Sequence, residues 1–182
     1  HRDLHSFPTR RSSDLELYVS KTMRQVLRRN LFRVTCDADF PGVIRGCRDP
    51  RKKEQGTWIT DEMMEAYIRL HEGGVAHSVE AWQDGVLAGG LYGISLGRCF
   101  FGESMFTRAP NASKAAFITL VRRLGELGYV VVDCQVYTSH LESLGARHIS
   151  RDEYIELLHA GLVLEGPRGS WNGLLGGPAE RV

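Results

Sequence analysis

The chain has 182 residues, of which 42% are apolar and 25% charged, and its formal net charge is +1. These values are typical of one soluble globular domain with its own core. No apolar run approaches the roughly 20 residues that a membrane-spanning helix needs. The four cysteines form no CxxC pair, so we expect reduced thiols in a cytoplasmic protein, with no zinc or other metal site and no disulfide framework.

Charge is unevenly distributed along the chain. Residues 21–53 carry ten Lys or Arg against three Asp, whereas residues 54–182 carry ten Lys or Arg against sixteen Asp or Glu. A basic block beside an acidic body suits a protein that holds a polyanion at one end and a cationic substrate at the other. The alternative is that the first basic residues of the block only form the solvated face of a helix. They are Lys21, Arg24, Arg28 and Arg29.

The two ends of the chain differ in composition from the region between them. Residues 1–14 have no usable periodicity and lack the apolar segment of a signal peptide. We therefore expect a non-native leader and leave it out of the predicted fold. Residues 161–182 are rich in Gly and Pro, which predicts a flexible tail. One domain is predicted over residues 15–160.

The first half of this domain is predicted to be mainly helical. Ser20 and Thr60 are good N-cap residues, and acidic residues directly after Thr60 suit the positive end of a helix. In chain order, the predicted elements are a helix over 21–29, a strand over 32–35, a helix over 38–47, a charged loop over 49–56 and a helix over 61–72.

The second half of the domain is predicted to contain most of a central sheet. The Asp84-Gly85 turn joins two apolar strands into a hairpin. In chain order, the predicted elements are strands over 75–82, 86–95 and 98–105, a helix from Asn111 or Ser113 to Leu127, a strand over 129–136, a helical turn over 139–142 and a helix over 150–159. The order of helices and strands indicates a mixed α/β fold.

Two of the predicted strands end in polar residues that are capable of chemistry. One ends with Glu103, and the other carries Asp133 and Gln135, which are two residues apart and so leave the same face of a strand. Burying a carboxylate or an amide costs free energy unless it is hydrogen-bonded. The pair therefore indicates a functional site. The alternative is that Asp133 only caps the loop after its strand.

The residues around these positions resemble the leucyl/phenylalanyl-tRNA–protein transferases, bacterial enzymes that add Leu or Phe to protein N-termini. The resemblance extends from about Leu17 to about Leu158. It rests on the strings over 56–60 (GTWIT), 76–80 (AHSVE), 89–93 (GGLYG), 102–106 (GESMF), 111–114 (NASK), 131–137 (VVDCQVY) and 139–146 (SHLESLGA). It also implies that an N-terminal domain found in the family is missing here.

The fold implied by the resemblance is acetyltransferase-like (GNAT-like), an α/β class with a mixed sheet flanked by helices. In that fold the strands over 98–105 and 129–136 lie parallel, and the helix over 112–127 joins them as a right-handed crossover. The two strands splay apart at one end. Glu103, Asp133 and Gln135 are expected to converge there, since ligands often bind between strand ends.

The activity implied is transfer of Leu, Phe or Met from aminoacyl-tRNA to the α-amine of proteins that begin with Arg or Lys, marking them for degradation by the bacterial N-end rule. Aminoacyl-tRNA and such proteins are the expected partners, and no cofactor or metal is expected. Asp133 and Gln135 are the expected catalytic residues: the Gln135 carbonyl accepts a hydrogen bond from the attacking amine, and Asp133 orients Gln135. Whether Asp133 is also a general base is left open.

The resemblance also assigns substrate-binding residues. Glu103, beside Ser104, is expected to meet the cationic acceptor residue, and the alternative for Glu103 is a salt bridge to Arg98 or Arg108. Trp58 and Tyr67 are expected to stack on the terminal adenine or to line the cleft, although Trp58 could instead staple the helix that follows it. His77 and His140 are expected to be structural, because no nucleophile stands at triad-like spacing.

An apolar pocket for the donor side chain is implied by the same resemblance. Three of its residues fall on one stripe of a helix and three on the strands that this helix should cover. They are Phe117, Leu120, Leu124, Leu91, Phe100 and Val132. By default such residues are simply core, and this alternative stays open. With the resemblance, Lys21, Arg24, Arg28 and Arg29 become the expected tRNA contacts.

Two other functions compete with this hypothesis. The first is an acyl-CoA-dependent N-acetyltransferase, but the segment over 107–112 (TRAPNA) lacks the glycines of a pyrophosphate-binding loop. The second is a truncated remnant that binds RNA weakly and is inactive. We expect the intact protein to be active and this chain to be weak or inactive.

Overall fold

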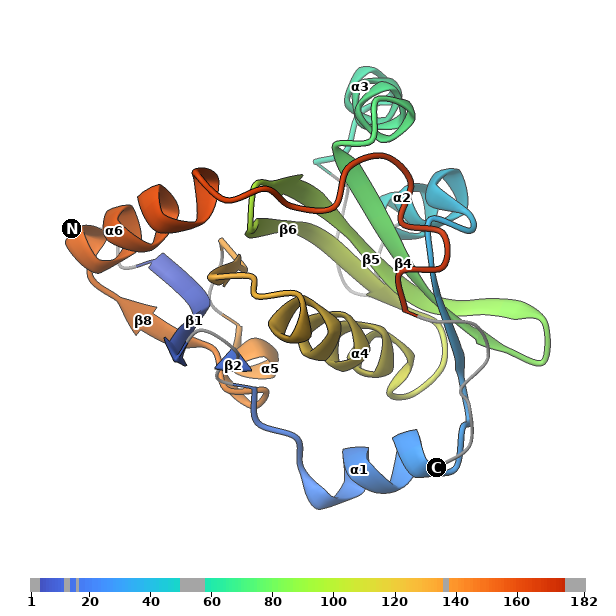
Figure 1. Ribbon diagram of the computed structural model, residues 1–182. Coiled ribbons are helices and arrows are strands. Elements are labelled where there is room, and N and C mark those ends of the chain that lie inside the picture. The colour runs from blue at the N-terminus through green and yellow to red at the C-terminus, as the bar shows by residue number, and fades with distance from the viewer. Residues whose placement is uncertain (1–3, 12–13, 16, 50–57, 136–137, 176–182) are drawn as a thin grey trace.

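The structure is a computed structural model that describes residues 4–11, 14–15, 17–49, 58–135 and 138–175. These residues form one eight-stranded sheet with helices on both faces (Figure 1). The strands are β1 (Leu4–Arg11), β2 (Asp14–Leu15), β3 (Arg33–Cys36), β4 (Ala76–Gln83), β5 (Val86–Leu96), β6 (Cys99–Thr107), β7 (Val131–Asp133) and β8 (Arg147–Ile149). The helices are α1 (Lys21–Arg28), α2 (Phe40–Arg48), α3 (Asp61–Glu72), α4 (Ala112–Glu126), α5 (Ser139–Glu142) and α6 (Arg151–Leu162).

The sheet is mixed, as the sequence predicts. Its order is β2-β1-β7-β6-β5-β4-β3, with β8 paired to β1. Strands β3 to β6 form a continuous antiparallel series. β6 and β7 run parallel, with Cys99 opposite Val131, and α4 is the crossover between them. The predicted α/β class is confirmed, including the parallel pair and crossover helix expected from the GNAT-like resemblance.

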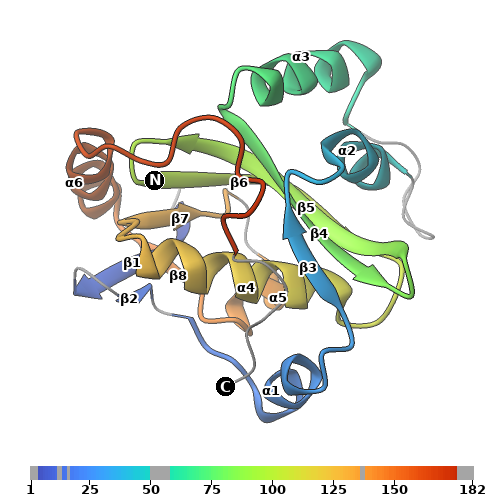
Figure 2. The ribbon, with the colours of Figure 1, turned by 45° about the vertical axis from the view of Figure 1, so that its right-hand side comes forward.

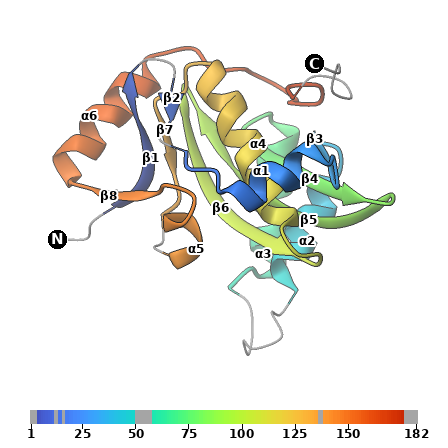
Figure 3. The same ribbon diagram turned by 90° about the horizontal axis from the view of Figure 1, so that it is seen from below.

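Helices cover the two faces of the sheet with separate hydrophobic clusters (Figure 3). α4 and α1 lie on one face, where α4 packs against β3, β4, β5 and β6. α2 and α3 lie on the other face, packed against each other and against β4. Residues next to each other on a strand therefore enter different clusters, as Leu91 and Tyr92 of β5 do.

Local capping signals place several helix starts where the sequence predicts them. The Ser20 side chain accepts from the Met23 N–H, the Thr60 side chain from the Met63 N–H, and the Ser150 side chain from the Glu153 N–H. Each bond satisfies one of the amides that a helix start leaves without an intrahelical partner. α4 differs, because Asn111 precedes it with φ at 72° and makes no side-chain cap.

The sheet extends further than the sequence predicts. Residues 4–11, which the prediction excluded from the fold, form β1 and pair antiparallel with β7 and β8. β8 was not predicted either. The proposed foreign origin of the leader stays a prediction. Conversely, the strand predicted over 129–136 is too long, because β7 ends at Asp133.

The segment after α6 passes over the sheet (Figure 2) and contains a buried tryptophan. Trp171 is 1% exposed and belongs to the cluster on the α4 face. Its ring stacks on His77 with centroids 3.8 Å apart. The composition of residues 161–182 predicts a flexible tail, whereas Trp171 anchors its first part by packing against His77. Within the described residues, no helix is both long enough and apolar enough to cross a membrane.

Candidate active site

The parallel strands β6 and β7 part at the position of the predicted catalytic pair. Their pairing ends with Phe101 opposite Asp133. β6 continues to Thr107, whereas β7 stops. Beyond this point Tyr92 of β5 lies opposite Ser104, but the next residue of β5 lies opposite Gly102. Glu103 is therefore the extra residue of a β-bulge, a device that redirects a side chain.

Gln135 lies directly beyond the end of β7 in a left-handed conformation, with φ at 57°. Its backbone N–H donates to Oδ1 of Asp133 at 2.8 Å, and its Nε2 donates to Oε1 of Glu103 at 3.1 Å. Because a carboxylate offers only acceptors, the amide nitrogen faces Glu103 and the amide oxygen is turned away from it. The Gln135 side chain is exposed, so its oxygen can accept a hydrogen bond from a bound molecule.

The structure brings Asp133 and Gln135 together in a different way from the prediction. The two residues do not share a strand face, because the turn at Gln135 breaks the alternation. Asp133 holds the backbone of Gln135 instead of its side chain. Asp133 therefore also caps the following loop, as the alternative interpretation predicted. Its side chain bonds the backbone two residues further along the chain.

Asp133 is 4% exposed, and both of its oxygens have hydrogen-bond donors. Oδ1 accepts from the Gln135 N–H, and Oδ2 accepts from the Tyr154 hydroxyl at 2.6 Å. Burial, followed by this bond and the charge of Asp133, raises the pKa of Tyr154. The hydroxyl is therefore a protonated donor at neutral pH. Tyr154 was not among the predicted site residues, because no local sequence pattern links α6 to the end of β7.

Tyr67 of α3 lies near Glu103. Burial, and then the charge of Glu103 and a hydrogen bond to it, raise the pKa of the Tyr67 hydroxyl. The Tyr67 ring contacts the edge of Tyr92, whose buried hydroxyl has no partner among the described residues. Tyr67 was predicted to line the site, and the structure places it beside Glu103. Ser104, opposite Tyr92, is partly buried.

The alternative salt bridges of Glu103 do not form. Arg98 donates to the backbone oxygens of Leu127 and Glu165. Arg108 pairs with Asp49 at 3.0 Å. Both candidate arginines are engaged elsewhere, whereas the Glu103 carboxyl group accepts from the Gln135 side chain.

The six residues predicted for the donor pocket are all buried core residues on the α4 face. Their side chains are 0–4% exposed and belong to one cluster. Tyr67 and Tyr92, beside Glu103, belong to the cluster on the opposite face. The core alternative accounts for the burial of Leu91, Phe100, Phe117, Leu120, Leu124 and Val132. Their role as a donor pocket stays a prediction, and it requires the donor to reach between the parted strands.

The remaining predicted contacts lie on the surface. Trp58 is exposed ahead of α3, while its neighbour Ile59 is the residue buried against α2. Trp58 therefore does not staple the helix, and its ring is accessible. On α1, an open hollow of about 350 Å³ is lined by four side chains, three of them predicted tRNA contacts. They are Lys21, Arg24, Gln25 and Arg28. Arg29 follows them and is exposed.

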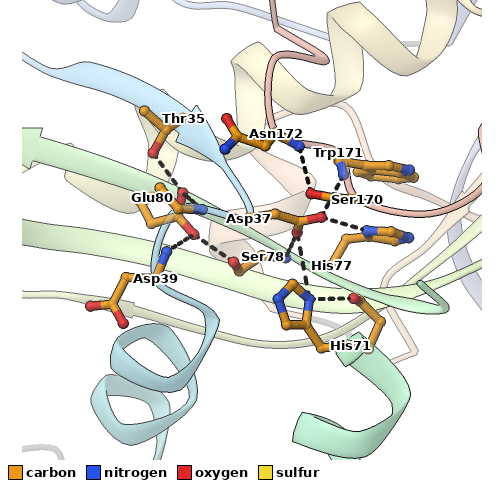
Figure 4. Close-up of polar contacts among 12 residues, drawn as sticks. Thr35, Asp37, Asp39, His71, His77, Ser78, Glu80, Ser170, Trp171 and Asn172 are labelled. Atoms are coloured by element: carbon orange, nitrogen blue, oxygen red, sulfur yellow. Dashed lines mark hydrogen bonds and ion pairs between the residues drawn. The ribbon is translucent and has the colours of Figure 1, made fainter. Parts of the chain in front are cut away.

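His77 is a structural residue, as predicted (Figure 4). It is fully buried, its Nδ1 lies 3.0 Å from Oδ2 of Asp37, and its ring stacks on Trp171. Asp37 also accepts from the backbone amides of Ser78 and Trp171. Burial raises the pKa of Asp37, but the hydrogen bonds from His77, Trp171 and Ser78 outweigh it, so the net shift is downward. The side chain of His140 lies outside the described residues.

A second buried carboxyl group belongs to the same region. Glu80 accepts from the hydroxyls of Thr35 and Ser78 and from two backbone amides at the start of α2. Burial raises the pKa of Glu80 despite these bonds. Neither Glu80 nor Asp37 is exposed to a substrate, and their contacts tie β3, β4 and the tail together. Among the described residues no group of three His, Cys, Asp or Glu is arranged to hold a metal ion.

The loop that would bind a CoA pyrophosphate in an acetyltransferase is occupied by internal contacts. The backbone amides of Arg108 and Ala109 both donate to the Ala88 oxygen, at 2.7 and 3.1 Å. The Ala112 amide donates to the Ala109 oxygen. A pyrophosphate needs free amides at this position. The structure therefore disfavours the acyl-CoA hypothesis.

Comparison with known proteins agrees with this geometry. The family described as leucyl/phenylalanyl-tRNA protein transferase matches residues 13–159. The leucyl/phenylalanyl-tRNA–protein transferase of Azotobacter vinelandii is 57% identical over 143 residues, which are 79% of this chain and 63% of the relative. That of Stutzerimonas stutzeri gives the same values. That of Syntrophus aciditrophicus is 54% identical over 158 residues, 86% of this chain and 66% of the relative.

The chain thus spans about two thirds of the length of the curated relatives it matches. The match includes the strands that carry Glu103 and Asp133 and the crossover helix between them. A match over 13–159 leaves little of the described domain outside it. The chain belongs to the leucyl/phenylalanyl-tRNA protein transferase family.

Proposed function

We propose that the protein to which this chain belongs transfers Leu or Phe from aminoacyl-tRNA to the N-terminal α-amine of proteins that begin with Arg or Lys. Such a reaction would mark those proteins for degradation by the N-end rule. The observation that carries the proposal is the placement of Gln135, which is fixed at the parted ends of β6 and β7 by Asp133 and Glu103. Family membership supports the class of reaction.

The reaction needs little beyond positioning. An α-amine has a pKa of about 7.7–8.0, so a useful fraction is already neutral near pH 7. The neutral amine attacks the ester carbonyl, the new C–N bond forms, the bond to the ribose oxygen breaks, and a proton passes from the nitrogen to that oxygen. Holding the two reactants together can supply up to about 7–11 kcal/mol of the barrier.

Gln135 is the residue best placed to hold the amine. Its amide oxygen faces away from Glu103 and can accept a hydrogen bond from the attacking nitrogen. That contact orients the nitrogen lone pair and favours the positive charge that builds on it. Asp133 is 4% exposed and lies behind Gln135, so we assign it to holding Gln135 and not to taking the proton.

Glu103 supports the choice of a cationic acceptor residue. One of its oxygens accepts from Gln135, and a carboxylate has about four acceptor positions. A lysine or arginine side chain beside the amine would use the remaining ones in a charge-assisted bond. The tRNA, in turn, is expected to contact the basic α1, where the hollow lined by Lys21, Arg24 and Arg28 offers positive charge to a phosphate backbone.

The test is transfer of labelled Leu from Leu-tRNA to a peptide that begins with Arg, compared with one that begins with Ala. It should be run on this chain and on a chimera that adds the N-terminal region of the Azotobacter vinelandii relative. We expect rapid transfer to the Arg peptide by the chimera, and slow transfer by the chain alone. Full activity of the chain alone would contradict the predicted truncation effect, and no transfer by either protein would contradict the proposed function.

A further inference from the structure

The hydroxyl of Tyr154 reaches the candidate active site from α6, a helix that supplies no other residue to it. Tyr154 is partly buried, and its oxygen lies 2.6 Å from Oδ2 of Asp133. Asp133 in turn holds the backbone of Gln135 at 2.8 Å. A chain of two hydrogen bonds therefore links α6 to the residue that we place against the attacking amine.

We propose that Tyr154 is a positioning residue for Gln135, acting through Asp133. This inference rests on the proposed function. Tyr154 has no direct role toward the substrate, because its hydroxyl is used by Asp133. Its effect is to fix the plane and rotation of the Asp133 carboxyl group, so that Oδ1 stays pointed at the Gln135 N–H.

Gln135 needs such support, because its backbone conformation is costly. A residue other than glycine is disfavoured in the left-handed region, because its Cβ lies too close to the following carbonyl oxygen. A hydrogen bond to a charged group is stronger than one between neutral groups. The bond that the Gln135 N–H donates to Asp133 therefore holds the turn, provided that the carboxyl group does not rotate away. Tyr154 prevents that rotation.

The Gln135 side chain has a separate support. Its Nε2 donates to Oε1 of Glu103 at 3.1 Å. Tyr67 of α3 lies near this carboxyl group, since burial and then the charge of Glu103 raise the pKa of its hydroxyl. The contacts that hold the backbone and the side chain of Gln135 are thus distinct. Loss of Tyr154 alone should free the backbone of Gln135 while its side chain stays on Glu103.

The variant that tests the inference is Tyr154→Phe, which removes only the hydroxyl. The matched control is Tyr129→Phe, because the Tyr129 hydroxyl also makes a single side-chain bond, 2.7 Å to Ser95, but lies away from Gln135. Two experiments are carried out on the 182-residue chain. The first is the single-turnover transfer rate with enzyme in excess, together with the enzyme concentration that gives half the maximal rate. The second is hydrogen exchange of the Gln135 amide by NMR.

For Tyr154→Phe we expect the maximal rate to fall about tenfold, since one misplaced contact can cost up to about 100-fold. The half-saturating concentration should change less than about twofold, because binding contacts are untouched. Exchange of the Gln135 amide should be about tenfold faster, in line with the loss of a bond worth roughly 1.4 kcal/mol. Tyr129→Phe should leave both the rate and the exchange at this amide unchanged.

Three results would overturn the inference. One is an unchanged maximal rate in Tyr154→Phe. Another is a change confined to the half-saturating concentration, which would assign Tyr154 to binding. The third is an equal loss in Tyr129→Phe, which would indicate a general effect on folding. If the unmodified chain shows no transfer, the exchange data decide alone: faster exchange in Tyr154→Phe supports positioning even though the proposed function fails, and unchanged exchange rejects it.

Discussion

Gln135 combines a strained backbone with an exposed amide, which is the pattern expected where a residue is kept for function and not for stability. The sequence identifies the residue but not its conformation. Alternation along a strand predicted that Asp133 and Gln135 share a face, whereas β7 ends at Asp133 and the chain turns. The turn depends on hydrogen bonds that Gln135 donates to Asp133 and Glu103, and single-residue propensities do not contain such bonds.

Replacing Gln135 by Gly should separate these two properties. Glycine adopts the left-handed conformation without cost, so Gln135→Gly is expected to raise the free energy of unfolding by about 1 kcal/mol. The amide is lost at the same time, so transfer should fall about 100-fold or more. Urea denaturation and a transfer assay measure the two effects. A variant that is both less stable and fully active would contradict the description of Gln135 as strained and functional.

Asp37 is the buried carboxyl group whose environment predicts a pH effect. Its folded pKa lies below the usual value, so its stabilising effect is fully present above the unfolded pKa of about 3.9 and is lost as the pH falls through the folded pKa. Asn tolerates the left-handed backbone at this position, where φ is 52°. Asp37→Asn thus removes the charge without adding backbone strain.

We expect Asp37→Asn to be less stable at pH 7 by about 1–3 kcal/mol, with the difference from the unmodified chain shrinking below about pH 4. Denaturation at several pH values measures it. Comparing the two proteins cancels the opposite effect of Glu80, whose raised pKa favours stability at low pH. The matched control is Asp84→Asn, since Asp84 has φ at 50° but is exposed in a turn. An equal change in this control would contradict the role of Asp37.

Helices and turns that depend on local sequence signals were predicted correctly. The helix predicted over 61–72 is α3, because its cap, its acidic first turn and its glycine stop lie in the segment itself. The hairpin of β4 and β5 turns at Asp84-Gly85 as predicted.

Elements that depend on distant partners were not predicted. β8 is short, and its pairing partner is β1. The segment around Trp171 has turn-like composition, and its burial comes from packing against His77 and Asp37, which are distant in the sequence.

The basic helix α1 should contribute electrostatic attraction without sequence specificity. Replacing Lys21, Arg24, Arg28 and Arg29 with Ala is expected to weaken tRNA binding at low salt. It should also reduce the slope of log affinity against log salt by about 0.7–0.9 for each phosphate that is no longer neutralised. Filter binding over a range of salt concentrations measures the slope. A control that removes exposed Arg69 and Arg168 should keep the slope, and an unchanged slope in the α1 variant would assign these residues to a solvated helix face.

The molecule as a whole places its chemistry at one end of the parallel pair. α4 crosses one face and separates β6 from β7 in sequence, and α3 and α6 bring Tyr67 and Tyr154 to the site. The basic α1 lies beside α4 (Figure 1). The resemblance in the sequence was sufficient for the fold, and it named Asp133 and Gln135, which the structure joins by a hydrogen bond. It could not reveal the bulge at Glu103, since register is a property of two strands and not of one.

The central claim is that Gln135 works where the pairing of β6 and β7 ends. The most direct measurement is the single-turnover rate of Leu transfer to an Arg-starting peptide by the chimera with the Azotobacter vinelandii N-terminal region, with and without Gln135→Ala. We predict that the substitution lowers the rate about 100-fold, while the half-saturating enzyme concentration changes little. A rate equal to that of the unsubstituted chimera would contradict the assignment of this site.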